Sequence, residues 1–286
     1  MRLALTLTAL ACLFLFSCQK ELSFENGGNP GGGGSNGTLL VKILSESPDG
    51  NLTTEYSYDP SYRLNGQTVT GTRSGTDKSS QIKISRNALG FITKILTTSA
   101  QLSGVGLDSA VFTVYNDPIT AKYTYSKSIH KDVGLPTIDS EAYVYDGAGR
   151  INAVEYYVGT VLDFPIYVLT TKLEIAYDSK NNITGLNVLA PDPNNPGSMN
   201  TAGIYKLTYD DKENPLPLGN DAVVLSNYTL YSSNNNIKME FTNPSYSLSN
   251  FTVTSDITYN SSKKPDKSVV TLMPDNTVTN QTYFYQ

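Results

Sequence analysis

Residues Tyr145–Ile151 read YDGAGRI, which is the pattern of a strand end, a tight turn and a strand start. Tyr145 would pack where the first strand ends, and the Asp146 carboxylate can accept hydrogen bonds from the backbone of the turn. A glycine at position 149 tolerates the positive φ that such turns require. The segment therefore predicts an antiparallel β-hairpin.

The Tyr-Asp pair recurs along the chain, which indicates an internal repeat. The copies are Tyr58-Asp59, Tyr145-Asp146, Tyr177-Asp178 and Tyr209-Asp210, and Tyr259-Asn260 is a variant of them. Arg86-Asn87 and Tyr115-Asn116 fill the gap in the first half of the chain. A repeat of about thirty residues corresponds to two long strands and their connections, so the chain predicts roughly 12–15 strands.

Between these turns, apolar and polar residues alternate with a period of two, as expected for half-buried strands. Examples are Leu52–Tyr58, Leu173–Tyr177 and Ile237–Phe241. Valine, isoleucine, threonine and tyrosine dominate the runs, and one face of each is polar, which favours antiparallel pairing. The sequence predicts an all-β fold, an antiparallel up-and-down meander without a convincing amphipathic helix.

The first 17 residues, MRLALTLTALACLFLFS, have a positive start and a short apolar run typical of a secretory signal peptide. The run is too short to span a membrane. It ends in Leu15-Phe16-Ser17-Cys18, which resembles the lipobox of bacterial lipoproteins. The resemblance implies cleavage before Cys18 and a diacylglycerol and an N-acyl chain on that residue. The alternative is an ordinary secreted protein with a chance cysteine.

Residues 18–37 join this leader to the repetitive region. Gln19-Lys20-Glu21 resembles the export tag of Bacteroidota surface lipoproteins, which implies display on the outer face of the outer membrane. A periplasm-facing anchor is the alternative. Asn26–Gly37 reads NGGNPGGGGSNG and predicts a flexible tether. The expected organisation is a signal peptide over 1–17, a lipidated linker over 18–37 and one β domain over 38–286.

The composition excludes several kinds of site. Of the 2 cysteines, Cys12 would leave with the signal peptide and Cys18 would carry lipid, so no thiolate metal site or disulfide is expected. The single histidine, His130, cannot form a histidine-rich metal site and reads as an exposed loop residue. A net charge of −5 does not suit a nucleic-acid binder. We expect no cofactor, no metal and no catalytic residue.

The Tyr-Asp-x-x-Gly-Arg pattern at Tyr145–Arg150 resembles YD repeats of the Rhs type, although only this copy matches closely. The layout of lipobox, glycine-rich tether and Tyr-Asp meander is more similar to Bacteroidota lipoproteins that contain a domain of unknown function with a porin-like fold. That resemblance implies a sheet curled into an open or partly closed barrel, and it transfers no catalytic residues. A barrel embedded in lipid would need a continuous apolar outer band, which these strands do not offer.

Two further features allow more than one interpretation. Several of the 20 tyrosines recur in pairs at even spacing, for example Tyr143 and Tyr145, so each such pair lies on one strand face. Such pairs can stack on sugars or line a groove for an amphiphile, but packing between strands is the commoner role. Ser109, in Asp108-Ser109-Ala110, resembles an O-glycosylation site of exported Bacteroidota proteins.

These observations predict a non-enzymatic cell-surface lipoprotein that binds a glycan, a lipid or a protein ligand and contacts the membrane only through its anchor. A structural or adhesive coat protein is the alternative. An enzyme of the glycoside hydrolase type is less favoured, because it needs two carboxylates about 5–10 Å apart in a cleft.

We expect a Cys18→Ala variant to lose membrane association, because the acyl chains on Cys18 are the only stable membrane anchor that the sequence predicts. Fractionation of cells into soluble and membrane parts measures this. The Cys12→Ala variant is the control and should stay with the membrane. Retention of the Cys18→Ala protein in the membrane fraction would rule out the anchor.

Overall fold

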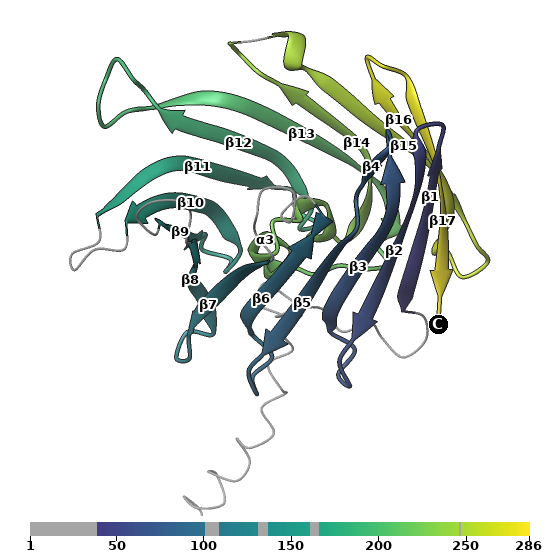
Figure 1. Cartoon of the computed structure of the whole chain (residues 1–286), viewed down its shortest axis with the longest axis horizontal. Helices are drawn as coiled ribbons and strands as arrows, with labels where there is room; N and C mark the ends of the chain where they lie inside the picture. The colour runs from purple at the N-terminus through teal and green to yellow at the C-terminus, as the bar shows by residue number, and fades with distance from the viewer. Residues whose placement is uncertain (1–38, 101–108, 131–136, 161–165, 246) are drawn as a thin grey trace, which may run out of the picture.

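The structure is a computed structural model that describes residues 39–100, 109–130, 137–160, 166–245 and 247–286. Within them the chain forms a curved wall of antiparallel strands with a few short helical turns (Figure 1). The strands are β1 Leu40–Ser47, β2 Gly50–Tyr58, β3 Leu64–Arg73, β4 Thr76–Asp77, β5 Ser80–Arg86, β6 Ile92–Ser99, β7 Ala110–Asp117, β8 Lys122–His130, β9 Thr137–Tyr145, β10 Ile151–Thr160, β11 Tyr167–Tyr177, β12 Ile183–Pro191, β13 Met199–Glu213, β14 Asn234–Thr242, β15 Phe251–Tyr259, β16 Pro265–Met273 and β17 Thr277–Tyr285. The helical turns are α3 Asn220–Val224, η1 Tyr228–Leu230 and η2 Ser247–Ser249.

The wall closes into a barrel, because the first strand pairs with the last. Ile43 of β1 lies opposite Tyr283 of β17, and Leu39 and Gln286 exchange backbone hydrogen bonds of 3.1 and 3.0 Å. The two-residue strand β4 pairs only with β3, so the other sixteen strands form the ring. A closed ring leaves no exposed sheet edge that could pair with another chain.

The predicted all-β antiparallel meander is confirmed, but its details differ from the expectation. Sixteen principal strands form the ring instead of roughly 12–15, and the barrel is closed instead of open or partly closed. Some hairpins, such as the one between Ser47 and Gly50, carry no Tyr-Asp pair, so a strand count based on that repeat is too low. Closure pairs residues from opposite ends of the sequence, so it cannot be predicted from a local sequence pattern.

The turn at Tyr145–Ile151 is built around the side chain of Asp146. Its Oδ1 accepts hydrogen bonds of 2.9 Å from the backbone N–H groups of Ala148 and Arg150, and its Oδ2 accepts one of 2.8 Å from Arg150 Nε. Gly149 adopts a φ of 81°. Partial burial opposes ionisation, but the bonds from Arg150 outweigh it and hold the pKa of Asp146 below its ordinary value.

The same turn is repeated around one rim of the barrel. The side chains that accept backbone hydrogen bonds from the residues two and four positions later are Asp59, Asn87, Asp178 and Asn260. The residue three positions later has a positive φ in each copy, for example 60° at Tyr62 and 64° at Asn181. Asparagine replaces aspartate in two copies because the turn needs an acceptor oxygen, and an amide supplies one.

Four tyrosines of this rim, Tyr58, Tyr177, Tyr209 and Tyr285, hydrogen-bond to the first residue of the preceding strand. Tyr177 donates a hydrogen bond of 2.5 Å to the carbonyl of Ile151, and Tyr209 donates one of 2.8 Å to Ile183. Ile151 and Ile183 are the first residues of β10 and β12. Burial raises the pKa of Tyr209 to about 12, so its hydroxyl stays protonated and can donate. These tyrosines therefore have a packing role at the rim.

Tyr209-Asp210 does not make the hairpin turn that the repeat predicts. Strand β13 runs through both residues to Glu213, and β14 begins only at Asn234. The Asp210 carboxylate accepts hydrogen bonds from the backbone of Asn235 and from the Tyr259 hydroxyl. The chain between the two strands enters the barrel. This copy of the motif therefore holds together the two ends of a long connection instead of forming a tight turn.

Most charged side chains of the strands lie on the outer side of the wall, whereas the buried apolar core lies on its inner side. Residues directly opposite each other on neighbouring strands point to the same side. Ile84 and Ile95 form a buried pair that faces the lumen, whereas Lys83 and Lys94 on the same strands are exposed on the outer side. Other charged residues at outward positions are Lys42, Glu46, Glu55, Lys127, Glu155, Lys172, Glu174, Lys206, Lys238, Glu240, Asp256 and Lys267. No helix in the described part of the chain has the length and apolar character needed to cross a membrane.

We expect Asp146→Ala to lower the free energy of unfolding by about 1–2 kcal/mol, because the turn loses charge-assisted hydrogen bonds while Arg150 stays in place. Chemical denaturation followed by circular dichroism measures the change. Asp275→Ala, at an exposed turn residue, is the control and should unfold close to the wild-type midpoint. Equal midpoints for the two variants would contradict the structural role of Asp146.

Candidate functional site

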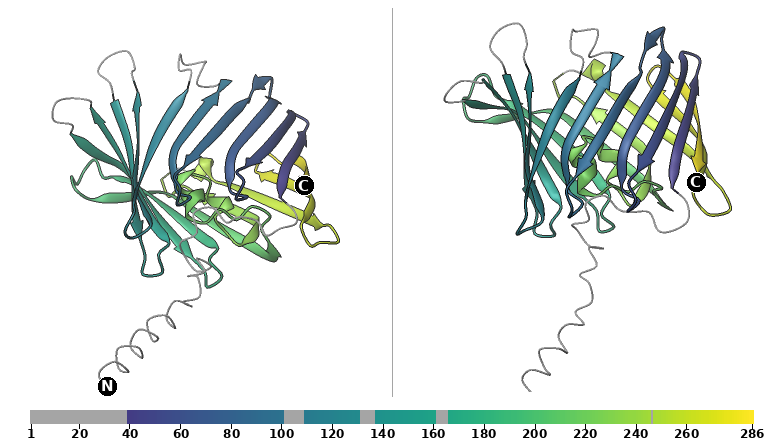
Figure 2. Two further views of the ribbon diagram at one scale, coloured as in Figure 1. Left: turned by 90° about the horizontal axis from the view of Figure 1, so that it is seen from below. Right: turned by 60° about the horizontal axis from the view of Figure 1, so that its bottom comes forward.

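The lumen of this barrel is partly filled by its own chain. Side chains of the wall fill a barrel of about eight strands, but a ring of sixteen encloses more space than they can occupy. Residues 214–233, here called the plug, leave β13, pass through the lumen as α3 and η1, and return to β14 (Figures 1 and 2). Leu216, Leu218, Ala222 and Val223 of the plug are all buried, with at most 4% of their surface exposed.

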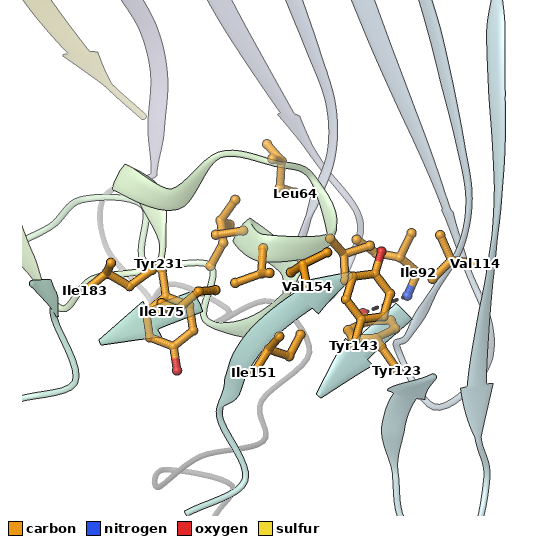
Figure 3. Close-up of a cluster of buried hydrophobic side chains, with 14 of the residues drawn as sticks. Leu64, Ile92, Val114, Tyr123, Tyr143, Ile151, Val154, Ile175, Ile183 and Tyr231 are labelled. Carbon is orange, nitrogen blue, oxygen red and sulfur yellow. Dashed lines mark hydrogen bonds between the residues drawn. The ribbon is translucent and has the colours of Figure 1, made fainter. Parts of the chain in front are cut away.

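The plug packs on lumen-facing residues near the rim that carries the tyrosine turns (Figure 3). Ile92, Ile151 and Ile183, which begin or nearly begin their strands, are completely buried in this cluster. Tyr231 of the plug stacks at a tilt on Tyr177, with ring centroids 5.0 Å apart. The hydrophobic core of the protein therefore lies at one end of the barrel, between plug and wall.

A buried ion pair fixes the plug to the wall. Arg86, the last residue of β5, contacts Asp221 of α3 at 2.6 Å, and their side chains are 5% and 0% exposed. Arg86 also donates hydrogen bonds of 2.9 Å to the carbonyls of Gly90 and Leu64. A buried charge is costly unless it is paired and hydrogen-bonded, and here Arg86 meets both conditions.

Tyr123 completes the ion pair. Its hydroxyl donates a hydrogen bond of 2.5 Å to Asp221 and accepts one of 3.0 Å from the backbone of Ile92. Burial raises the pKa of Asp221, although Arg86 and Tyr123 both favour the carboxylate. Burial and the adjacent carboxylate also raise the pKa of Tyr123, so its hydroxyl stays protonated as a donor.

Polar side chains of the plug also bind backbone groups at the strand starts. Asn220 accepts a hydrogen bond of 3.2 Å from the backbone N–H of Ile151, and Ser232 accepts one of 3.0 Å from that of Ile183. Asn220 in addition donates to the carbonyl of Gly149 in the turn. These bonds satisfy backbone groups that the ladder leaves unpaired, so the plug is a built part of the barrel.

Beyond η1 the lumen contains an apolar cavity of about 400 Å³. This volume lies within the range of about 300–1,000 Å³ that is typical of small-molecule sites. The wall residues around it are mainly apolar: Leu173, Leu186, Val188, Tyr205, Leu207 and Met239. The plug forms its floor with residues 226–229, and Tyr228 of this floor meets Tyr156 of the wall with their hydroxyls 2.9 Å apart.

A second, more polar cavity of about 460 Å³ adjoins the first. Asp139 and Glu141 of β9 line it, and it shares Tyr156 and Thr171 with the apolar cavity. Glu141 accepts hydrogen bonds of 3.0 Å from the Tyr143 hydroxyl and 3.3 Å from Ser126 Oγ. Burial raises the pKa of Glu141, and these donors oppose the rise. Together the two cavities offer an apolar region and an acidic end.

The residues predicted from the sequence do not converge on this lumen. Cys18, Gln19, Lys20 and Glu21 lie outside the described residues, so lipidation and export stay predictions. Ser109 is exposed immediately before β7, and the turn residues lie at the rim. His130 ends strand β8 instead of lying in a loop. In the described part of the chain no group of three or more histidine, cysteine, aspartate or glutamate residues could hold a metal.

The sequence did not predict which residues face the lumen, and the reason is physical. In β9 the positions that alternate with Asp139 and Glu141 include Ile138, Ala142 and Val144, so the pattern gives no sign that the two acids face inward. The plug had a usable signal, because the stretch from Leu216 to Leu225 departs from the period of two and contains the run Ala222–Leu225. A break in the alternation inside a meander of this kind marks a segment that leaves the wall.

Two solved structures have a similar fold. A porin-like protein from Bacteroides uniformis matches with a TM-score of 0.52 and 12% identity over 86% of this chain and 98% of its own. A porin-like protein from Bacteroides vulgatus matches with a TM-score of 0.50 and 12% identity over 87% of this chain and 99% of its own. No protein-family model and no curated protein matches the sequence. The porin-like barrel implied by the sequence resemblance is thus confirmed as a fold.

We expect Asp221→Ala to lower the free energy of unfolding by about 3–5 kcal/mol, because Arg86 would keep a buried charge without a partner. Urea denaturation of the purified protein measures the loss. Asp211→Ala is a suitable control, since Asp211 is an exposed aspartate that pairs only with Lys212. An Asp221→Ala variant as stable as this control would contradict the anchoring of the plug by the ion pair.

Proposed function

We propose that this protein is a non-enzymatic, lipid-anchored protein of the outer membrane surface that binds a small ligand with an apolar part inside its barrel. The observation that carries the proposal is the apolar cavity above the plug, lined by residues such as Leu186, Leu207 and Met239. Sugars need polar partners and stacking faces, whereas these side chains suit an alkyl chain or a similar apolar group. A lipid or another amphiphile is therefore the favoured ligand.

The distribution of charge supports a barrel that stands in water. Lysine and glutamate occupy outward positions on most strands, and pairs such as Lys172 with Glu174 meet there at 3.2 Å. A wall in contact with lipid tails would place these charges at a large energetic cost. The lipobox at Cys18 and the glycine-rich segment over 26–37 support attachment by acyl chains and a flexible tether, with the barrel held outside the bilayer.

The adhesive alternative has one supporting observation on the outer wall. Tyr115 and Tyr125 stack with ring centroids 4.3 Å apart, and the Lys127 amine lies 5.4 Å from the Tyr115 ring centroid. Val111 and Ile129 on the neighbouring strand positions are 37% and 55% exposed. This surface could contact another protein or a glycan. It lacks the enclosure of the lumen, so we rank it second.

An enzyme of the glycoside hydrolase type has only the Asp139–Glu141 pair to support it. The two residues occupy alternate positions of β9 and thus face the same side, about 7 Å apart along the strand. An inverting glycosidase needs at least two carboxyl groups at about this distance. Two facts disfavour this role. Ser126 and Tyr143 already donate hydrogen bonds to the Glu141 carboxylate, and the adjoining cavity is lined by apolar side chains that do not suit a sugar.

The binding proposal predicts that decan-1-ol binds to the Cys18→Ala protein, which can be prepared without detergent. Met239→Trp should weaken this binding at least about tenfold, because the larger ring occupies the apolar cavity. Isothermal titration calorimetry measures both affinities. Lys238→Trp adds the same ring to the outer wall and should leave binding unchanged. Equal affinities for all three proteins, or no binding at all, would refute a lumen site.

A further inference from the structure

Glu141 is an acidic group inside the lumen wall, and no cation among the described residues pairs with it. The groups that face it come from three strands: Ser126 of β8, Asp139 and Tyr143 of β9, and Tyr156 of β10, which meets Tyr228 of the plug. None of the ion pairs between described residues includes Glu141. Only two neutral hydroxyl donors and the lumen therefore compensate its carboxylate.

Ser128 supplies an independent observation at the same place. Its side chain is 2% exposed, and its Oγ has no hydrogen-bond partner. Ser128 lies directly opposite Asp139 of β9 and Phe112 of β7, both of which line the polar cavity, so it points to the same side of the wall. A buried hydroxyl is normally hydrogen-bonded, and an unused one beside a cavity indicates where a ligand could bind.

The position of the acidic end relative to the apolar cavity suggests the shape of that ligand. Glu141 lies directly opposite Tyr156, and Tyr156 lines both cavities. A molecule whose tail contacts Leu173 and Val188 in the apolar cavity would therefore bring its head group past Tyr156 to Glu141. The acidic cavity therefore adjoins the apolar cavity at Tyr156 and Thr171.

We infer that the ligand of the proposed lumen site carries a cationic amine head group, which pairs with Glu141 and hydrogen-bonds to Ser128 while its apolar part fills the cavity. This inference rests on the binding function proposed above and narrows it to one class of amphiphile. An ammonium group has three donors and no acceptor, so carboxylate and hydroxyl oxygens satisfy it. It also supplies the countercharge that a buried carboxylate otherwise lacks.

The test compares decylamine with decan-1-ol, two probes of equal chain length, on the Cys18→Ala protein at pH 7.5. We expect decylamine to bind at least about tenfold more tightly than decan-1-ol. Glu141→Gln should bring the affinities for decylamine and decan-1-ol together, because glutamine retains the shape of the side chain without its charge. Glu155→Gln changes the net charge equally on the outer side of β10 and should keep the preference.

The possible outcomes separate the two proposals. Binding of decan-1-ol without a preference for decylamine, or a preference that survives in Glu141→Gln, overturns the amine inference and leaves the lumen function standing. Failure of both probes to bind overturns the lumen function itself. A preference that Glu155→Gln removes as completely as Glu141→Gln shows general attraction to an acidic protein and also overturns the inference.

A measurement on the protein with Glu141 intact gives a second test. Burial raises the pKa of Glu141, and the nearby Asp139 carboxylate raises it further, whereas Tyr143, Tyr156 and Tyr228 stay protonated. As the pH falls through that raised pKa, Glu141 becomes neutral and the preference for decylamine should fade, while decan-1-ol binding should not change. A constant preference from pH 7.5 to pH 4 would contradict the inference.

Discussion

The width of the lumen is the constraint on which the rest of this structure depends. Sixteen strands enclose more space than inward side chains can fill, and an open apolar interior would be unstable in water. The chain resolves this by sending residues 214–233 into the barrel, where the buried pair Arg86–Asp221 and Tyr123 hold them against the wall. Without that contact, the wall residues of the core at this rim would lose the plug residues against which they pack.

The plug also explains why the protein has a site. It fills one end of the lumen and forms the floor of the apolar cavity, which the more polar cavity adjoins; there the hydroxyls of Tyr228 and Tyr156 meet. The barrel has sixteen strands in its ring, and most charged residues of these strands lie on the outer side. This distribution supports the binding protein that we propose over a water-filled pore through the membrane.

The sequence predicted what depends on local physics. The Asp146 turn, the antiparallel alternation and the packing role of the tyrosines follow from neighbouring residues alone. Tyr209-Asp210 has the same letters, yet β13 continues to Glu213 and the chain then enters the plug, where the stretch from Leu216 to Leu225 does not alternate. Closure between Leu39 and Gln286, and the inward direction of Glu141, depend on distant parts of the chain and leave no local pattern.

We expect the ligand to bind inside the barrel and not on its outer wall. A crystal structure of the Cys18→Ala protein with a decylamine that carries bromine at the end of its chain would test this most directly. We expect an anomalous bromine peak in the apolar cavity between Leu207 and Met239, with the amine toward Glu141. A bromine peak only on the outer wall, for example beside Tyr125, would contradict it.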